Sequence, residues 1–114
     1  MQDWDVNRQE LFRKASTYFE CVLMTDPKEP TALREYGGLY YDFHRWDDAL
    51  NMWEKLTSVV ESDYHYWLCA NVCQSTEKIH MLPVYCQRGL MCPDTGYHKE
   101  LNALTPPSLP IQPV

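Results

Sequence analysis

Apolar side chains follow one another at intervals of three and four residues near the start of the chain. Between residues 7 and 25 they stand at Leu11, Ala15, Tyr18, Phe19 and Val22. This spacing is that of one face of an α-helix, and Asn7 followed by Glu10 matches the capping-box pattern that begins a helix. The pattern therefore predicts a helix over residues 7–25.

The same pattern returns farther along the chain at a constant offset. Ala15, Phe19 and Val22 recur as Ala49, Trp53 and Leu56, and Leu33 and Tyr36 recur as Trp67 and Ala70. A fixed period of about 34 residues indicates stacked copies of one supersecondary unit, because a single copy cannot bury its own apolar face. Two further helices are expected at residues 31–44 and 46–60, separated by a tight turn.

The middle copy resembles the tetratricopeptide repeat (TPR), a hairpin of two helices, A and B. It carries the motifs Leu33-x2-Tyr36-Gly37-x2-Tyr40 and Ala49-x3-Trp53-x2-Leu56, after an Asp26-Pro27 step where the preceding repeat closes. The resemblance implies an all-α, superhelical array of antiparallel helix hairpins. Gly37 and Ala49 are then small because helices A and B cross closely there.

The resemblance covers about two and a half repeats. Residues 7–25 match a half repeat, residues 30–63 a full repeat, and residues 64–93 a degenerate repeat in which Asn71 replaces the Gly and Pro83 lies in the first turn of the last helix.

Two segments complete the expected layout. Residues 94–104 are expected to form a short capping helix, so that the TPR-like domain spans residues 1–104. Residues 105–114 form a Pro-rich tail that is extended by composition.

The resemblance also implies a binding groove, since stacked helix pairs commonly hold a partner on the concave surface formed by their first helices. Helical geometry places on its floor Arg34, Gly38, Tyr41, Asp42, His65, Leu68, Val72 and Ser75. For Tyr41 and Leu68 we expect either contact with a ligand or burial against neighbouring helices. TPR proteins that hold chaperone C-termini by a carboxylate clamp carry several basic residues along this floor, and Arg34 is almost alone here, which disfavours that mode.

The half repeat leaves an apolar surface without an obvious neighbour. Helix 7–25 carries Phe12, Phe19, Val22 and Leu23 on adjoining faces, and one neighbouring repeat is too little to cover them. Burying a side chain of this size stabilises a protein by about 1.5–3 kcal/mol, so we expect self-association or a partner protein at this end. The tail presents Leu109 and Ile111 between prolines, and it is either a ligand for the groove or a solvated end.

Composition narrows the class of protein. The 114 residues are 45% hydrophobic, which is enough for one folded domain. A net charge of -6 without any basic block argues against nucleic-acid binding. No stretch approaches the roughly 20 apolar residues of a membrane span, the start lacks the features of a signal peptide, and five Cys make an odd number. We therefore expect a cytoplasmic protein with reduced thiols and no membrane insertion.

The Cys and His residues are the remaining candidates for chemistry. His65, Cys69 and Cys73 recur every four residues, and His80, Cys86 and Cys92 lie on the neighbouring segment. Such a set could supply the N and S ligands of a zinc site, or the base and the nucleophile of a cysteine enzyme. We favour core positions, because no C-x2-C knuckle is present and a core face also repeats every four residues. We expect no metal, no cofactor and no enzymatic activity, and keep a zinc-binding or cysteine-dependent protein as a remote alternative.

The length and layout are similar to those of the small TPR chaperones of bacterial type III secretion, which hold a hydrophobic export substrate in the cytoplasm. The stretch YWLCANVCQSTEKIHMLPVYCQRGLMCPD resembles their third-repeat segment in its aromatic-Leu opening. The similarity implies a small chaperone or adaptor that binds another protein or peptide. The alternative is a structural or assembly subunit of a larger complex, in which both open ends of the array contact other chains.

Overall fold

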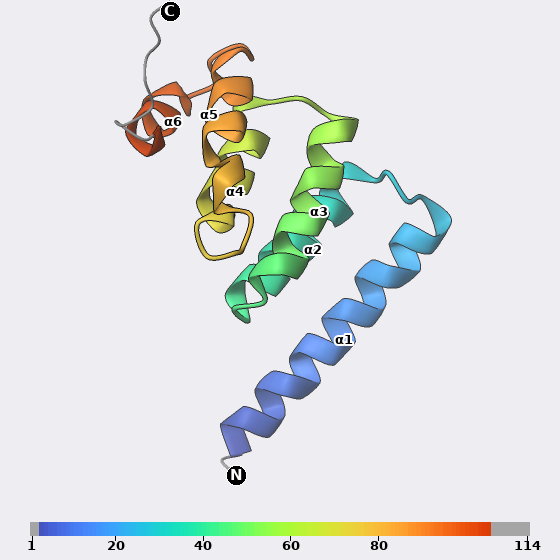
Figure 1. Ribbon diagram of the computed structural model, residues 1–114. Helices are drawn as coiled ribbons and strands as arrows, with labels where there is room; N and C mark the ends of the chain where they lie inside the picture. Colours follow the sequence, from blue (N-terminus) through green and yellow to red (C-terminus); the bar gives the residue numbers. More distant parts are fainter. Residues whose placement is uncertain (1–2, 106–114) are drawn as a thin grey trace, which may run out of the picture.

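The computed structural model describes residues 3–105, and helices joined by short loops are the regular secondary structure of this part of the chain, which contains no strand (Figure 1). The helices are α1 (Asp3–Thr25), α2 (Pro30–Asp42), α3 (Trp46–Val59), α4 (Asp63–Cys73), α5 (Leu82–Leu90) and α6 (His98–Leu104), with one 3₁₀ turn at Ile79–Met81. The predicted all-α fold is confirmed over this range. The tail, with Leu109 and Ile111, lies outside the described residues.

Consecutive helices pack against one another along the chain. Helices α2 and α3 form one antiparallel hairpin and α4 and α5 the next, while α1 lies against α2 and α6 lies against α5 and α4 (Figure 1). The result is a short TPR-like array in which α2 and α4 correspond to the first helices of two successive hairpins.

Helix α1 is longer than predicted. It begins at Asp3, so the exposed Asn7 lies inside the helix and the predicted capping box is wrong. Residues 3–6 contain no Gly or Pro that would stop the helix, which therefore continues toward the N-terminus. No helix between residues 3 and 105 combines the length and the apolar character that crossing a membrane requires.

The other helix boundaries follow from local chemistry. Helix α2 begins with Pro30, where a missing N–H costs nothing, and the Glu29 carboxylate caps it by accepting a hydrogen bond from Ala32 N at 2.8 Å. Ser62 caps α4 by accepting a hydrogen bond from Tyr64 N at 3.2 Å. Pro83 stands in the first turn of α5, as predicted.

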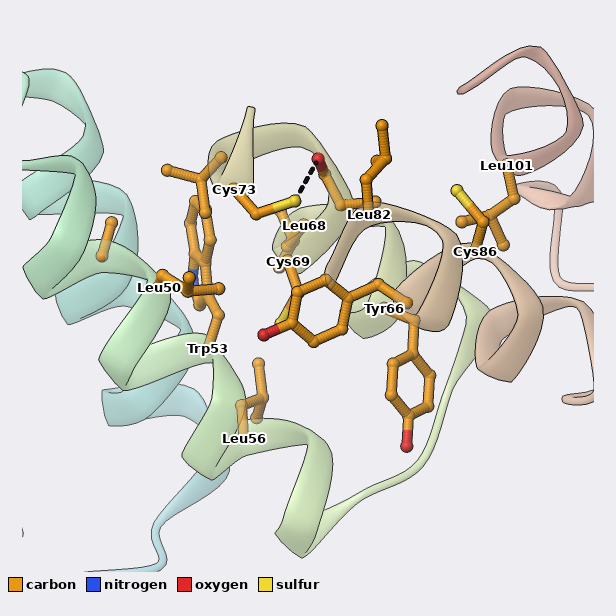
Figure 2. Close-up of a cluster of buried hydrophobic side chains, with 14 of the residues drawn as sticks. Leu50, Trp53, Leu56, Tyr66, Leu68, Cys69, Cys73, Leu82, Cys86 and Leu101 are labelled. Carbon is orange, nitrogen blue, oxygen red and sulfur yellow. Dashed lines mark hydrogen bonds between the residues drawn. The ribbon is translucent and has the colours of Figure 1, made fainter. Parts of the chain in front are cut away.

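The core lies between the two hairpins. Figure 2 shows Leu50, Trp53 and Leu56 on one side of it and Cys69 and Cys73 on the other. All five side chains are buried, and they belong to α3 and α4, which pack directly on each other.

Gly37 is required by the packing within the middle hairpin. A Cβ atom at this position would overlap the Trp53 indole, whose Nε1 donates a hydrogen bond to the Arg34 carbonyl at 3.0 Å. The close approach predicted at Gly37 is therefore real, and its nearest atoms belong to Trp53 rather than to Ala49.

Helix α6 is held by a second small residue, which the sequence pattern did not identify. A Cβ atom at Gly89 in α5 would lie 2.6 Å from Leu101 Cδ1 and 3.0 Å from Tyr66 Cβ. The Leu101 side chain is fully buried in this notch. The last helix consequently docks by inserting one leucine over a glycine.

A run of aromatic rings joins α1 to α2. The Phe19 ring stacks on Tyr36 with centroids 5.4 Å apart, Tyr36 stacks on Tyr40 at 4.5 Å, and Phe12 lies 4.8 Å from Phe43. The Tyr36 hydroxyl donates a hydrogen bond to Glu20 at 2.7 Å, and burial together with this bond raises the pKa of Tyr36.

These contacts change the expectation of an uncovered α1 surface. The four side chains that we expected a partner to cover, Phe12, Phe19, Val22 and Leu23, are each partly buried within the chain itself. Aromatic rings of α2 and the following turn lie against Phe12 and Phe19, and Leu23 packs against the core. The apolar side chains that protrude most from the described part of α1 are Leu11, Tyr18 and Met24, at 63%, 65% and 83% exposure, followed by Val6 at 50%.

Candidate partner-binding groove

An open cavity of about 600 Å³ lies between α2 and α4. Five aromatic side chains contribute to its lining: Phe19, Tyr41, Trp53, Tyr64 and Trp67. The remaining wall includes Leu39 and Leu68 and four polar side chains, Arg34, Glu35, Asp42 and Asn71. We call this cavity the groove.

Five of the eight predicted floor residues line the groove, namely Arg34, Gly38, Tyr41, Asp42 and Leu68. His65 and Val72 do not line it: both side chains are buried on other sides of α4, and the ring Nδ1 of His65 pairs with the Val60 carbonyl at 2.9 Å. Ser75 is exposed but lies beyond the end of α4, outside the groove. The predicted α2 wall therefore agrees with the structure better than the predicted α4 wall.

The difference on α4 comes from a shift of a single position. Helix α2 begins at Pro30 and α4 begins at Asp63, an offset that is shorter by one position than the period used in the prediction. With the shorter offset, Cys69 and Ala70 occupy the repeat positions that are equivalent to those of Tyr36 and Gly37, and all four residues are buried. Ala70, rather than Asn71, thus holds the small-residue position of the third copy.

The same shift explains which α4 side chains face the groove. Tyr64, Trp67, Leu68 and Asn71 form a stripe at helical spacing along this wall. The N-cap serine at position 62 is the sequence signal that identifies this register, because it fixes the first turn of the helix.

The aromatic surface continues beyond the α4 wall. Tyr97, just before α6, has its ring centroid 4.9 Å from that of Tyr64 and 5.1 Å from that of Trp67. On the opposite wall, Tyr41 lies 5.8 Å from Trp53 and remains 41% exposed. Aromatic rings of this kind bury much area with few rotamers to fix, so they suit recognition of another chain.

The charged groups of the groove are few and nearly balanced. Arg34 supplies one positive charge, and Glu35 and Asp42 supply two negative charges. The groove therefore offers few opposite charges to pair with a highly charged ligand of either sign. The groove favours a segment that is recognised through apolar and ring contacts with a few hydrogen bonds.

Four of the six candidate His and Cys side chains are buried, namely His65, Cys69, Cys73 and Cys86, whereas His80 is exposed and Cys92 is only partly buried, so the expected core position is wrong for His80. Cys69, Cys73 and Cys86 are buried free thiols, and the Cys73 thiol donates to the Ala70 carbonyl at 3.3 Å. Burial raises the pKa of Cys69, and it raises the pKa of Cys73 to about 11. A thiolate is the reactive and metal-binding form, so these surroundings favour neither a cysteine nucleophile nor a zinc ligand.

A different trio, Asp63, Asp94 and His98, brings three possible ligand atoms together. The buried Asp63 carboxylate accepts hydrogen bonds from the Thr95 hydroxyl, from Thr95 N at 2.8 Å, and from Tyr97 N at 3.2 Å. Burial by itself raises the pKa of Asp63, but these hydrogen bonds outweigh it and hold the pKa below its usual value. The carboxylate thus fastens the segment before α6 to the start of α4.

Comparison with protein-family models gives no match, and comparison with curated proteins gives none. Among solved structures, the fold is similar to the crystal structure of MamA, a TPR-repeat protein, with a TM-score of 0.69 and 19% sequence identity. The aligned region covers 91% of this chain and 63% of the MamA chain, so this chain spans less than two thirds of the length of MamA. At this identity the similarity shows the fold, which is that of a TPR-like helical array.

Proposed function

We propose that this chain is a non-enzymatic protein–protein interaction module that holds a segment of a partner protein in the groove. The observation that carries the proposal is the aromatic lining between α2 and α4. A volume of about 600 Å³ accommodates several side chains of a ligand, and apolar walls with a few polar groups are typical of binding sites. Partly exposed Trp and Tyr side chains are also the residue types that dominate binding energy at protein interfaces.

The form of this activity that we propose is a small cytoplasmic chaperone or adaptor, similar to the TPR chaperones of type III secretion. Two hairpins and an extra helix on each side support it, because this layout presents one groove on a compact scaffold. A chaperone of this kind is expected to co-purify with a small helical partner that aggregates when alone.

Gly38 offers a way to close the groove without disturbing the fold. It lies in the groove wall, and a Cβ atom built there meets nothing within 4 Å. A Gly38→Leu side chain therefore projects into the space that a ligand would occupy. Thr31→Leu is the matched control, because Thr31 is exposed on the same helix and lies outside the groove.

The test is a selection of phage-displayed random peptides on the full chain. We expect selected peptides to bind the chain and the Thr31→Leu variant equally, and to bind Gly38→Leu at least tenfold more weakly. Circular dichroism and the melting temperature check that both variants are folded. Selected peptides that bind Gly38→Leu as well as the parent chain would move binding away from the groove.

A structural or assembly subunit is the second candidate, and it is favoured by the apolar side chains that protrude from α1. Leu11, Tyr18 and Met24 are all more than half exposed, as expected of a helix that contacts another chain. Tyr18→Glu separates the two functions. A partner released by Tyr18→Glu and retained by Gly38→Leu binds α1, whereas the reverse pattern identifies the groove.

A further inference from the structure

We propose that the groove is specific for extended, proline-rich segments, and that in the free protein it is occupied by the chain's own residues 106–114. The inference rests on the proposed function, since it names the ligand class of the same groove. It makes the tail an internal competitor that a partner segment must displace.

The first argument is the chemistry of the groove surface. Tyr41 faces the groove from one wall and Tyr64 and Trp67 from the other, and Tyr97 extends the rings past the edge of α4. Proline-rich segments dock on surfaces of this kind, because their rings pack flat on aromatic faces and the polyproline II helix is already formed before binding. The near balance of charge in the groove also suits an uncharged segment.

The second argument is the spacing of prolines in the tail. Residues 106–114 read PPSLPIQPV and contain no Lys, Arg, Asp or Glu. Pro107, Pro110 and Pro113 stand three residues apart. A polyproline II helix has about three residues per turn, so these three rings share one edge of the segment. A row of prolines on one edge is the ligand that a row of aromatic rings recognises.

The third argument is reach. Tyr97 contacts Trp67 at the groove edge, and α6 follows at once with seven residues, His98–Leu104. A helix of that length carries the chain only about 10 Å away. The nine residues 106–114 span about 28 Å in the polyproline II conformation, which is enough to return past α6 to the groove.

The test uses the full chain and a fluorescein-labelled peptide with the sequence of residues 105–114. The edge variant replaces the three prolines of the shared edge with alanine, at Pro107, Pro110 and Pro113. The control variant also carries three alanines in the tail, at Pro106, Ser108 and Gln112, which lie off that edge. A fourth protein adds Gly38→Leu to the edge variant, and fluorescence anisotropy measures peptide binding to all of them.

We expect the edge variant to bind the labelled peptide about tenfold more tightly than the parent chain. A tethered tail competes at an effective concentration of about 1 mM, which gives this factor for a peptide Kd of roughly 100 µM. The control variant should behave like the parent chain, and Gly38→Leu should abolish binding to the edge variant. The difference in peptide affinity between the edge variant and the parent chain should not change with protein concentration, because the tail competes within its own chain.

Three results overturn the proposal. The first is equal binding of the peptide to the parent chain and both tail variants, and the second is no binding to the edge variant at 1 mM peptide. The third is competition that grows with protein concentration, which would assign the groove to the tail of a second copy. If the tail peptide does not bind, but selected library peptides bind the parent chain and lose binding in Gly38→Leu, the tail proposal alone is refuted. If neither binds, the proposed function fails as well.

Discussion

The two adjacent glycines of α2 predict opposite responses to the same substitution. At Gly38 an added methyl group enters open space, so Gly38→Ala should stabilise the protein by about 0.5–1 kcal/mol through its better helix propensity. At Gly37 the same methyl group overlaps the Trp53 indole. Relieving that overlap costs about 1–3 kcal/mol, and losing the Trp53 hydrogen bond to Arg34 adds about 0.5–1.5 kcal/mol. After subtracting the propensity gain, we expect Gly37→Ala to destabilise by about 2 kcal/mol.

Urea unfolding followed by tryptophan fluorescence and far-UV circular dichroism measures both effects. For a domain of this size, each 1 kcal/mol corresponds to about 4–8 °C in melting temperature, so the two variants should melt on opposite sides of the parent chain. Trp53→Phe removes the ring that meets Gly37 and places there the residue type of Phe19, its counterpart in the preceding copy of the motif. The cost of Gly37→Ala should shrink by roughly 1 kcal/mol or more in that background. Equal stability of the two alanine variants would refute the packing of Trp53 over Gly37.

Three other predictions concern the contacts of α4, α5 and α6 and the reactivity of the thiols. Asp63→Asn should destabilise by about 1–3 kcal/mol in urea unfolding, because it removes the charged acceptor of a buried network. The pKa of Asp63 is lowered in the folded state, so the stability that its carboxylate contributes is complete above the unfolded pKa of about 3.9 and is lost as the pH falls through the folded pKa. An Asp63→Asn variant whose stability depends on acid pH as the parent chain's does would contradict this. Gly89→Ala should cost about 1–3 kcal/mol by displacing Leu101 and should increase hydrogen exchange in α6, whereas unaltered exchange would argue against the notch. Iodoacetamide should label the exposed Cys21 in the folded protein and the buried Cys69 only after unfolding, as peptide mass spectrometry would show.

The class of fold and the middle hairpin can be predicted from local sequence patterns. The recurrence of one apolar pattern at a constant offset predicted an all-α array, and the predicted helices at 31–44 and 46–60 agree with α2 and α3 within two residues at each end. These features are encoded locally. Prolines near the end of α1 stop one helix and start the next, and the small, aromatic and aliphatic positions of the hairpin repeat at helical spacing.

The register of α4, and with it one wall of the groove, differs from the strict sequence period. The Ser62 cap marks the start of this helix locally, and the Asp63 carboxylate then holds that first turn to Thr95 and Tyr97, from a distant part of the chain. No local pattern reports the contacts of Asp63, and a strict period of 34 residues, applied without regard to the Ser62 cap, misplaced the wall by a single position. His65 and Val72 consequently entered the core, while Trp67 faces the groove.

The side chains that cover α1 and α6 depend on how the helices pack together. The aromatic rings of α2 extend over Phe12 and Phe19, and Leu101 is buried over Gly89, as only the packed arrangement reveals. A sequence period reports which face of each helix is apolar. It does not report how far the neighbouring side chains reach across that face, because their reach depends on the distance and angle between helices, which the whole fold sets.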